Sequence, residues 1–154
     1  MKYISSFFTL VLIVAVLTGC KKDEEEAPDN LQIVIEKISG TWSVSYAELD
    51  GNGLTEAFTG LQITTDSDLL FSTNSSTVER QPNPWAESGS FTLPDEITST
   101  DNVLITRNDG VVLSLLFITE TNVQVTFNFN NDNIGSNGRV SAVSGDWVFE
   151  FEKI

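Results

Sequence analysis

The segment Val123-Gln124-Val125-Thr126-Phe127-Asn128-Phe129 alternates apolar and polar side chains without interruption. Successive side chains of a β-strand point to opposite faces of a sheet, so this period of two predicts a half-buried strand. One face of this strand is Val and Phe and the other is Gln, Thr and Asn. The segment therefore predicts a sheet with one face in a core and the other in solvent.

Seven more segments are predicted to be strands, and short turns join most of them: residues 41–46, 57–65, 69–71, 88–93, 102–107, 111–119 and 147–152. Two of the turns, Asp50-Gly51-Asn52-Gly53 and Asn108-Asp109-Gly110, are rich in residues that tolerate positive φ, as hairpins require. Long alternating strands with open edges invite aggregation, and closure into a barrel removes the edges. We therefore predict an all-β, eight-stranded antiparallel up-and-down barrel, whose interior has room for side chains or one small ligand.

A short helix is predicted in front of the barrel. Leu31, Val34, Ile35 and Ile38 recur at helical spacing, Asn30 is a candidate N-cap, and Ser39-Gly40 follows the last apolar position. A strand through residues 33–35 is the alternative reading of the same apolar run.

The order of elements resembles a known family from Gly40-Thr41-Trp42 onward. A short helix that leads into Gly-x-Trp on the first strand of a barrel is similar to the lipocalin-like domains of bacterial lipoproteins. The resemblance covers residues 31–154. It implies that Trp42 closes one end of the barrel under a basic side chain of the last strand, which here is Lys153 where an Arg is more usual. It also implies that the domain binds a small, often apolar molecule.

The N-terminus has the pattern of a lipoprotein signal. Lys2 precedes an apolar run over residues 7–17, and Leu17-Thr18-Gly19-Cys20 ends it with small residues before the only cysteine. A run of about eleven residues is shorter than the ~20 needed to span a bilayer. We expect residues 1–19 to be a signal peptide and Cys20 to carry lipid, including acyl chains such as palmitate. The alternative is an uncleaved membrane anchor with a free Cys20.

Residues 20–30 are expected to be the lipidated cysteine followed by a disordered acidic tether, because the segment is charged and offers nothing to bury. Lys22-Asp23-Glu24-Glu25 resembles the surface-export signal of Bacteroidetes lipoproteins. The resemblance implies an outer-membrane protein that faces the outside of the cell. A solvated linker has a similar composition and remains the alternative.

The charge balance limits the partners. The chain has 8 Lys and Arg against 22 Asp and Glu, and its net charge is −14. Nucleic acid is excluded as an expected partner, because phosphate binding needs clustered basic residues. Anionic headgroups would repel the body as well, so we expect contact with the membrane through the lipid alone.

Few residues suit catalysis. The chain has no histidine, and lipidation occupies the one cysteine, so the usual bases, nucleophiles and zinc ligands are missing. Alignment of Gly53 with the invariant EF-hand glycine places Glu48 first and Thr59 last, where calcium binding requires Asp and Glu. Glu150 and Glu152 share one face of the last strand, where we expect them in solvent. We predict no enzyme, no metal site and no cofactor other than the covalent lipid.

Two aromatic residues are the ligand-binding candidates. Trp85 follows Pro84 in a polar segment, where it can stack on a sugar or an apolar ring or pack over an open end of the barrel. Tyr46 shares a predicted strand face with Trp42, and a buried, hydrogen-bonded core position is the simpler reading. The sequence thus favours a cell-surface lipoprotein that binds a small apolar ligand or glycan fragment. The alternatives are a filled barrel that interacts with a partner of the envelope and, third, a carboxylate-dependent hydrolase.

Overall fold

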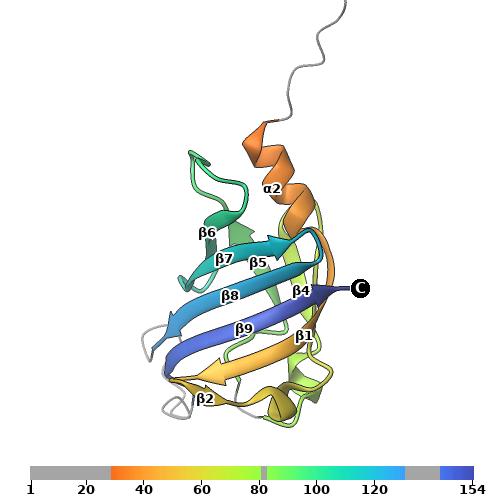
Figure 1. Cartoon of the computed structure of the whole chain (residues 1–154), viewed down its shortest axis with the longest axis vertical. Helices are drawn as coiled ribbons and strands as arrows, with labels where there is room; N and C mark the ends of the chain where they lie inside the picture. The colour runs from red at the N-terminus through yellow and green to blue at the C-terminus, as the bar shows by residue number, and fades with distance from the viewer. Residues whose placement is uncertain (1–28, 81–82, 131–142) are drawn as a thin grey trace, which may run out of the picture.

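The computed structural model describes residues 29–80, 83–130 and 143–154. The strands of the described residues form one antiparallel sheet in the order β2-β1-β3-β4-β5-β6-β7-β8-β9, and pairing of β1 with β9 closes it into a barrel (Figure 1). The strands are β1 (Gly40–Leu49), β2 (Asn52–Gly53), β3 (Gln62–Thr65), β4 (Leu70–Thr73), β5 (Ser88–Thr92), β6 (Asn102–Arg107), β7 (Val112–Thr119), β8 (Asn122–Phe129) and β9 (Gly145–Lys153).

The predicted eight-stranded up-and-down barrel is confirmed. The strands pair in sequence order, except that β1 pairs with β3 as well as with β2, and β2 adds only two residues to a hairpin with β1. The closing pair is long: β1 and β9 pair from Trp42 opposite Lys153 to Leu49 opposite Trp147, with one register shift between Val44 and Tyr46. The architecture is consistent with a lipocalin-like barrel.

One predicted strand is wrong in its first half. Residues 57–65 were expected to be extended, but Thr55–Phe58 forms the 3-10 helix η1 and only Gln62–Thr65 (β3) is a strand. Phe58 and Leu61 are both fully buried and lie three residues apart. A strand places such residues on opposite faces, whereas a turn of helix places them on the same side. The interior therefore decides the local conformation here.

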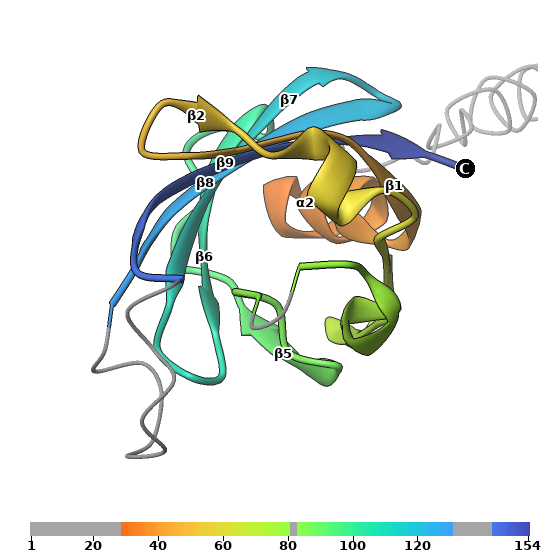
Figure 2. The ribbon, with the colours of Figure 1, turned by 90° about the horizontal axis from the view of Figure 1, so that it is seen from below.

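The N-terminal helix α2 (Asn30–Ile38) is confirmed, and the alternative strand is wrong. Its N-cap is Asp29 rather than Asn30, because the Asp29 side chain accepts the hydrogen bond from the amide of Leu31. Val34 and Ile38 are buried against the barrel. The helix lies across one end of the barrel in Figure 1, and in the view from below it falls within the ring of strands (Figure 2).

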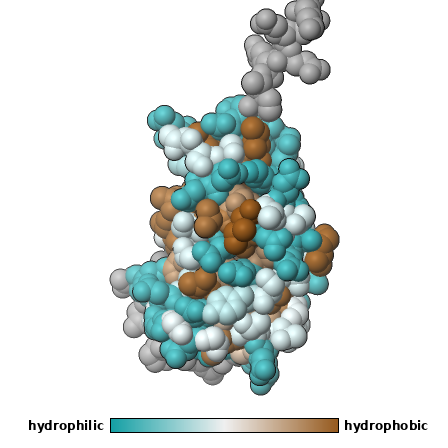
Figure 3. All heavy atoms as spheres, in the orientation of Figure 1, coloured by the Kyte–Doolittle hydropathy of each residue, from teal (hydrophilic) through white to brown (hydrophobic). Residues whose placement is uncertain are grey.

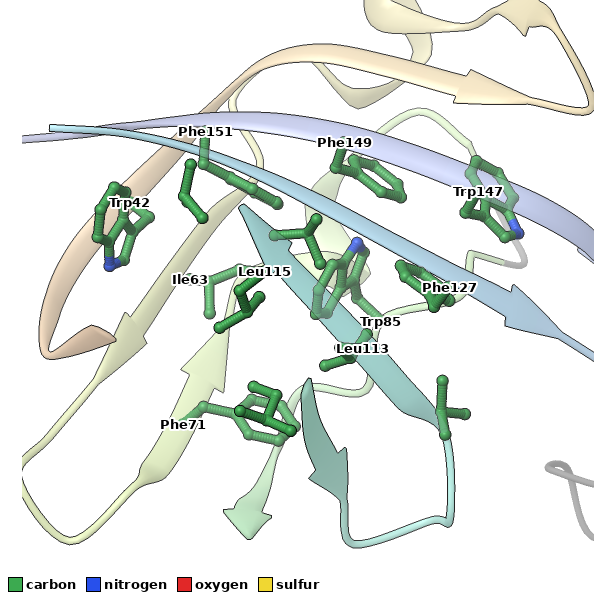
Figure 4. Close-up of a cluster of buried hydrophobic side chains, with 14 of the residues drawn as sticks. Trp42, Ile63, Phe71, Trp85, Leu113, Leu115, Phe127, Trp147, Phe149 and Phe151 are labelled. Atoms are coloured by element: carbon green, nitrogen blue, oxygen red, sulfur yellow. The ribbon is translucent and has the colours of Figure 1, made fainter. Parts of the chain in front are cut away.

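The core is the barrel interior. It consists of the inward-facing residues of the eight long strands, with Phe149 fully buried and Trp147 1% exposed. Figure 4 shows Trp42, which comes from β1, at one side of the interior, and Trp85, which comes from outside the strands, at the centre among residues of β7, β8 and β9. A second 3-10 helix, η2 (Ser75–Thr77), lies in the segment that carries Trp85.

Candidate functional site

Trp42 and Lys153 meet at the end of the barrel that α2 covers. The two residues are register partners on β1 and β9, and the Lys153 Nζ lies 5.1 Å from the centroid of the Trp42 ring. The Trp42 Nε1 donates a hydrogen bond to the Ile38 carbonyl oxygen at 2.8 Å. The arrangement is a cation–π contact stacked over a closed barrel end.

The last carbonyl groups of α2 find their partners in this same cluster. Lys153 Nζ donates to the carbonyl oxygens of Glu36, at 3.4 Å, and Lys37, at 3.3 Å. A helix leaves its last four carbonyls unsatisfied, and a cation at this end also complements the helix dipole. Lys153 therefore fixes the helix to the barrel.

Gly40 is required by the same cluster. Its φ is +122°, and a Cβ at this position would lie 2.7 Å from the Cε of Lys153. Only glycine accepts both the backbone conformation and the close approach. The Gly-x-Trp pattern thus has a local physical basis: Gly40 makes room for the lysine that covers Trp42.

Trp85 lies inside the barrel, with 5% of its surface exposed. Its ring makes edge contacts with Phe127, Phe149 and Phe151 at centroid distances of 5.5, 5.6 and 5.8 Å. The ring lies in the interior rather than over an open end of the barrel, so that reading is wrong, and Trp85 is one of the residues that line the small cavity described below. Its Nε1 is buried and has no hydrogen-bond partner among the described residues, and Figure 4 shows the nitrogen directed toward the rings of β9. Contact with those π faces is the compensation available to it.

Arg107 holds Trp85 in place, and the sequence interpretation missed it. It is 1% exposed, and its guanidinium carbon lies 5.6 Å from the Trp85 centroid. Its Nη1 donates to the Pro84 carbonyl oxygen at 2.8 Å, while Nε and Nη2 donate to the two carboxylate oxygens of Asp109 at 2.8 and 2.6 Å. A buried arginine needs such a bidentate partner. Its position in the alternation Val103, Ile105, Arg107 was the available signal, since it predicts that Arg107 points inward.

The Arg107–Asp109 pair changes the titration of the carboxyl group. Partial burial by itself raises the pKa of Asp109, but the hydrogen bonds and the positive charge of Arg107 outweigh it, so the pKa lies below its ordinary value. Asp109 is therefore ionised at neutral pH. The Asn108-Asp109-Gly110 turn acts as both a hairpin and the counter-ion of the buried arginine.

A small cavity lies between Trp85 and α2. Its volume is about 50 Å³. Thr65 is the only residue with a polar side-chain group, apart from the two tryptophans, among those that line it: Ile38, Trp42, Ile63, Thr65, Trp85, Phe91, Ile105, Leu113, Leu115, Phe117, Val123, Val125 and Phe151. A cavity of this size has room for a few water molecules and is about a third of the 150 Å³ that accommodates benzene.

Tyr46 is not in the core, so the expectation of a buried position is wrong. The register of β1 against β9 shifts between Val44 and Tyr46, and this bulge turns Ala47 inward in place of Tyr46. The Tyr46 hydroxyl donates to the Glu48 carboxylate at 2.5 Å on the outside of the barrel. This hydrogen bond raises the pKa of the Tyr46 phenol above its ordinary value.

The outer wall of the barrel separates into two regions by charge. Strands β3 to β8 contain one charged residue, Arg107, and it points inward, whereas β9 alone carries Asp146, Glu150, Glu152 and Lys153. Glu150 and Glu152 lie on the outer face, opposite Phe149 and Phe151, as expected. The uncharged wall includes exposed apolar side chains, and apolar surface interrupts the hydrophilic surface in the region of β7 in Figure 3. We call four of them the β6–β7 patch: Leu104, Val112, Leu116 and Ile118.

The predicted signal peptide, Cys20 and tether up to residue 28 lie outside the described residues. Within residues 29–80, 83–130 and 143–154, no group of three His, Cys, Asp or Glu residues is arranged to hold a metal ion. The helices in that part of the chain are too short or too polar to cross a membrane.

Comparisons with family models, with curated proteins and with solved structures each found no match to this chain.

Proposed function

We propose that this protein is a non-catalytic, lipid-anchored protein of the cell envelope whose filled barrel serves as an interaction module. The observation that carries the proposal is the size of the interior cavity, about 50 Å³. Sites for small molecules generally measure about 300–1,000 Å³. A carrier of the lipocalin type needs such a space, and this barrel fills most of it with its own side chains.

The filling is specific. Trp85 is held by the guanidinium of Arg107, and Arg107 in turn is held by Asp109 and the Pro84 carbonyl. A ligand that displaced Trp85 would remove the ring from the guanidinium of Arg107, which is buried and is not solvated by water. We therefore treat Trp85 as a plug that forms part of the core, and we assign the function to the outer surface of the barrel.

The outer surface supports the same proposal. A net charge of −14 keeps proteins apart, yet the outer faces of β3 to β8 carry no charge at all. Leu104 lies opposite Ser114, so Val112 and Leu116 are its diagonal neighbours across the strand pair. Contiguous exposed apolar side chains on a soluble domain are typical of interaction sites.

The anchor and the location belong to the proposal on the strength of the sequence. The pattern Leu17-Thr18-Gly19-Cys20 supports a lipidated Cys20, and the acidic run behind it supports export to the outer surface of the outer membrane. Replacement of Cys20 by alanine should abolish labelling of the protein with radioactive palmitate in the producing cells. Unchanged labelling would remove the lipoprotein assignment.

A second candidate function is binding of a very small apolar molecule in the cavity, because its lining is almost entirely apolar. Native mass spectrometry of the full chain, purified in detergent from its own cells, distinguishes the two. The interaction module predicts the bare mass of the mature, lipidated chain. A retained small molecule that is lost on replacement of Leu115 by phenylalanine would favour the carrier and contradict the filled-barrel proposal.

Photo-crosslinking in living cells tests the interaction directly. A photoreactive residue in place of Leu116 or Ile118, on the uncharged wall, should give a discrete crosslinked protein. The same residue in place of the exposed Ser45, on β1, is the matched control and should give none. Absence of any crosslink from both regions of the wall would contradict the interaction module.

A further inference from the structure

The barrel wall has a short seam between β5 and β6. These strands pair only through Phe91 with Arg107 and Thr92 with Thr106. By contrast, β6 pairs with β7 from Asn102 to Thr106 on its other side. The remainder of β6, residues 102–105, has no strand beside it on the β5 side among the described residues.

The alternation of hydrogen bonds identifies the free groups on this edge. Asp101 and Arg107 bond to β7 through the pairs with Phe117 and Val111, so Val103 and Ile105 also direct their backbone groups toward β7. The intervening Asn102 and Leu104 direct theirs toward β5. The Asn102 amide is taken by the Ser99 Oγ at 3.2 Å.

Three backbone polar groups of β6 remain on the β5 side. The backbone N–H of Leu104 and the carbonyl oxygens of Leu104 and Asn102 have no backbone partner among residues 29–80, 83–130 and 143–154. They form a short, open strand edge on an otherwise closed sheet.

A groove lies directly over this edge. Its volume is about 450 Å³, and it runs between the segment after β5 and the outer side of β6 and β7. The residues that line it are Pro94, Glu96, Ile97, Thr98, Ser99, Asn102, Val103, Leu104 and Ser114. Pro94 has no amide hydrogen and restricts the residue before it, which explains why the chain leaves β6 at this point instead of extending β5.

The outer wall of the groove is fixed in place. The side chain of Asn30 donates to the Ile97 carbonyl oxygen at 2.9 Å, and Lys37 Nζ donates to the Thr100 carbonyl oxygen at 3.2 Å. Helix α2 thus supports the 93–101 segment, which rises beside it in Figure 1. The groove is preformed, so a guest does not have to open it.

Charge indicates which guest the groove suits. Glu96 lines it, Asp95 is the exposed neighbour of Glu96, and none of the lining residues is basic. Leu104, which is 58% exposed, and Ile97 supply apolar surface at the same place. A segment with apolar side chains and flanking Lys or Arg is complementary to both features.

We infer that this groove binds an extended, basic-flanked peptide segment of a partner protein, which adds a strand to the open edge of β6. The inference rests on the proposed function as an interaction module and names its docking site. Backbone hydrogen bonds to Leu104 and Asn102 hold the segment, and alternate side chains of the guest contact Leu104 and Ile97. The β6–β7 patch continues the contact beyond the groove.

The test uses the full chain in detergent and a fluorescent peptide, Lys-Val-Thr-Val-Thr-Val-Lys, whose binding is measured by anisotropy. Saturable binding is expected, and it should weaken as salt is added. A peptide with Glu in place of both Lys residues should bind at least about fivefold more weakly. Equal affinity for the two peptides would overturn the charge argument.

Two matched pairs of variants place the peptide in the groove. Leu104→Lys should weaken binding at least about tenfold, whereas Leu70→Lys, an equally exposed leucine on β4 (54% against 58%), should leave it unchanged. Glu96→Lys should weaken binding more than Glu120→Lys, because Glu120 is exposed in the turn between β7 and β8 and does not line the groove. Each substituted side chain is exposed, so the fold is retained.

Hydrogen exchange tests strand addition itself. The peptide should slow exchange of the Leu104 amide, and a version methylated on alternate backbone nitrogens should lose both binding and protection. Binding without protection at Leu104 would mean a side-chain contact only and would overturn strand addition. Dimerisation of the chain without peptide that Leu104→Lys abolishes would identify a second copy as the guest and overturn the assignment to a partner protein.

Failure of the inference and failure of the proposed function give different results. If the photoreactive residue on the β6–β7 patch captures a partner but Leu104→Lys does not weaken that capture, the interaction module stands and the groove assignment falls. If no region of the wall captures a partner, the proposed function falls, whatever the peptide does.

Discussion

The two halves of the barrel interior are filled in different ways. Around Trp147 and η1, the half-barrel is packed with aromatic rings: Phe58 contacts Trp147 and Phe149 edge-on at 5.5 and 5.1 Å, and Phe127 stacks on Phe149 at 6.0 Å. The half beneath α2 is mostly aliphatic and contains the 50 Å³ cavity. Both halves lie within the same eight strands.

The difference comes from residues outside the regular strands. In the aromatic half, Phe58 from η1 and Trp85 from the segment after η2 enter the barrel and fill what the strand side chains leave open. In the aliphatic half, Ile38 of α2 and Trp85 join the strand residues around the cavity, and space remains. A barrel of this size is therefore a carrier or a filled scaffold according to what its loops insert.

Removal of the Trp85 side chain should have the largest effect on stability, because Trp85 fills the aromatic half of the interior. Trp85→Ala should lower the free energy of unfolding by about 3–5 kcal/mol, because it deletes a buried aromatic side chain and leaves a cavity. The same variant should become hollow and bind a small apolar dye that the unmodified protein excludes. Urea unfolding and dye fluorescence measure the two effects. The control Trp85→Phe should lose less stability and bind less dye, and equal stability of Trp85→Ala and the unmodified protein would contradict the role of Trp85 as a core residue.

Loss of Arg107, which holds Trp85 in place, should have the second-largest effect on stability. Arg107→Met should cost about 3 kcal/mol, because it removes the cation that pairs with Asp109 and the donor to the Pro84 carbonyl. The matched control, Lys153→Met, acts at the other end of the barrel, where the lysine is more exposed, and should cost less. A larger loss for Lys153→Met in urea unfolding would reverse the assignment of the more tightly coupled half.

A larger side chain should stabilise the protein in one half of the interior and destabilise it in the other. Val125→Ile adds one methylene group beside the cavity and should stabilise the protein by about 0.5–1 kcal/mol. Val111→Ile makes the same change next to the Arg107 turn, where Val111 is 1% exposed, and should destabilise it by about 1–3 kcal/mol. Thermal unfolding of both variants checks the prediction, which fails if the two changes have the same sign.

The smallest expected effect is on pH dependence. The folded-state pKa of Asp109 lies below that of the unfolded chain, so its contribution is present at neutral pH and is lost as the pH falls through the folded-state value. The difference in stability between the unmodified protein and Asp109→Asn should therefore shrink between about pH 5 and pH 2. A difference that does not change over this range would mean that the carboxylate charge contributes nothing to the Arg107 cluster.

Several elements were predictable because their signals are local. The period of two in β8 and β9, the turn residues before β2 and β7, and the apolar stripe of α2 each follow from a few neighbouring residues. Trp42 and Lys153 were proposed together from a resemblance, and the structure brings them together at the closed end. Cys20 stays a prediction.

The errors share a physical cause. The place of Trp85 depends on Arg107, which follows it by 22 positions, and Tyr46 faces outward because a bulge absorbs one residue between β1 and β9. Residues 55–61 leave the strand pattern because Phe58 and Leu61 both reach the core. Each outcome depends on which distant side chain fills a given volume, and local periodicity contains no information about that.

The sequence by itself determined that this protein is an acidic, all-β barrel with a helix in front, because alternation, turn chemistry and charge are properties of neighbouring residues. Only the tertiary structure decided whether the barrel is hollow and where its wall is open. Trp85 enters the interior and Pro94 ends β5 short of its neighbour, and both matter through the segments they meet in space. Close packing assigns each interior volume to one side chain, and that assignment exists only once the chain has folded.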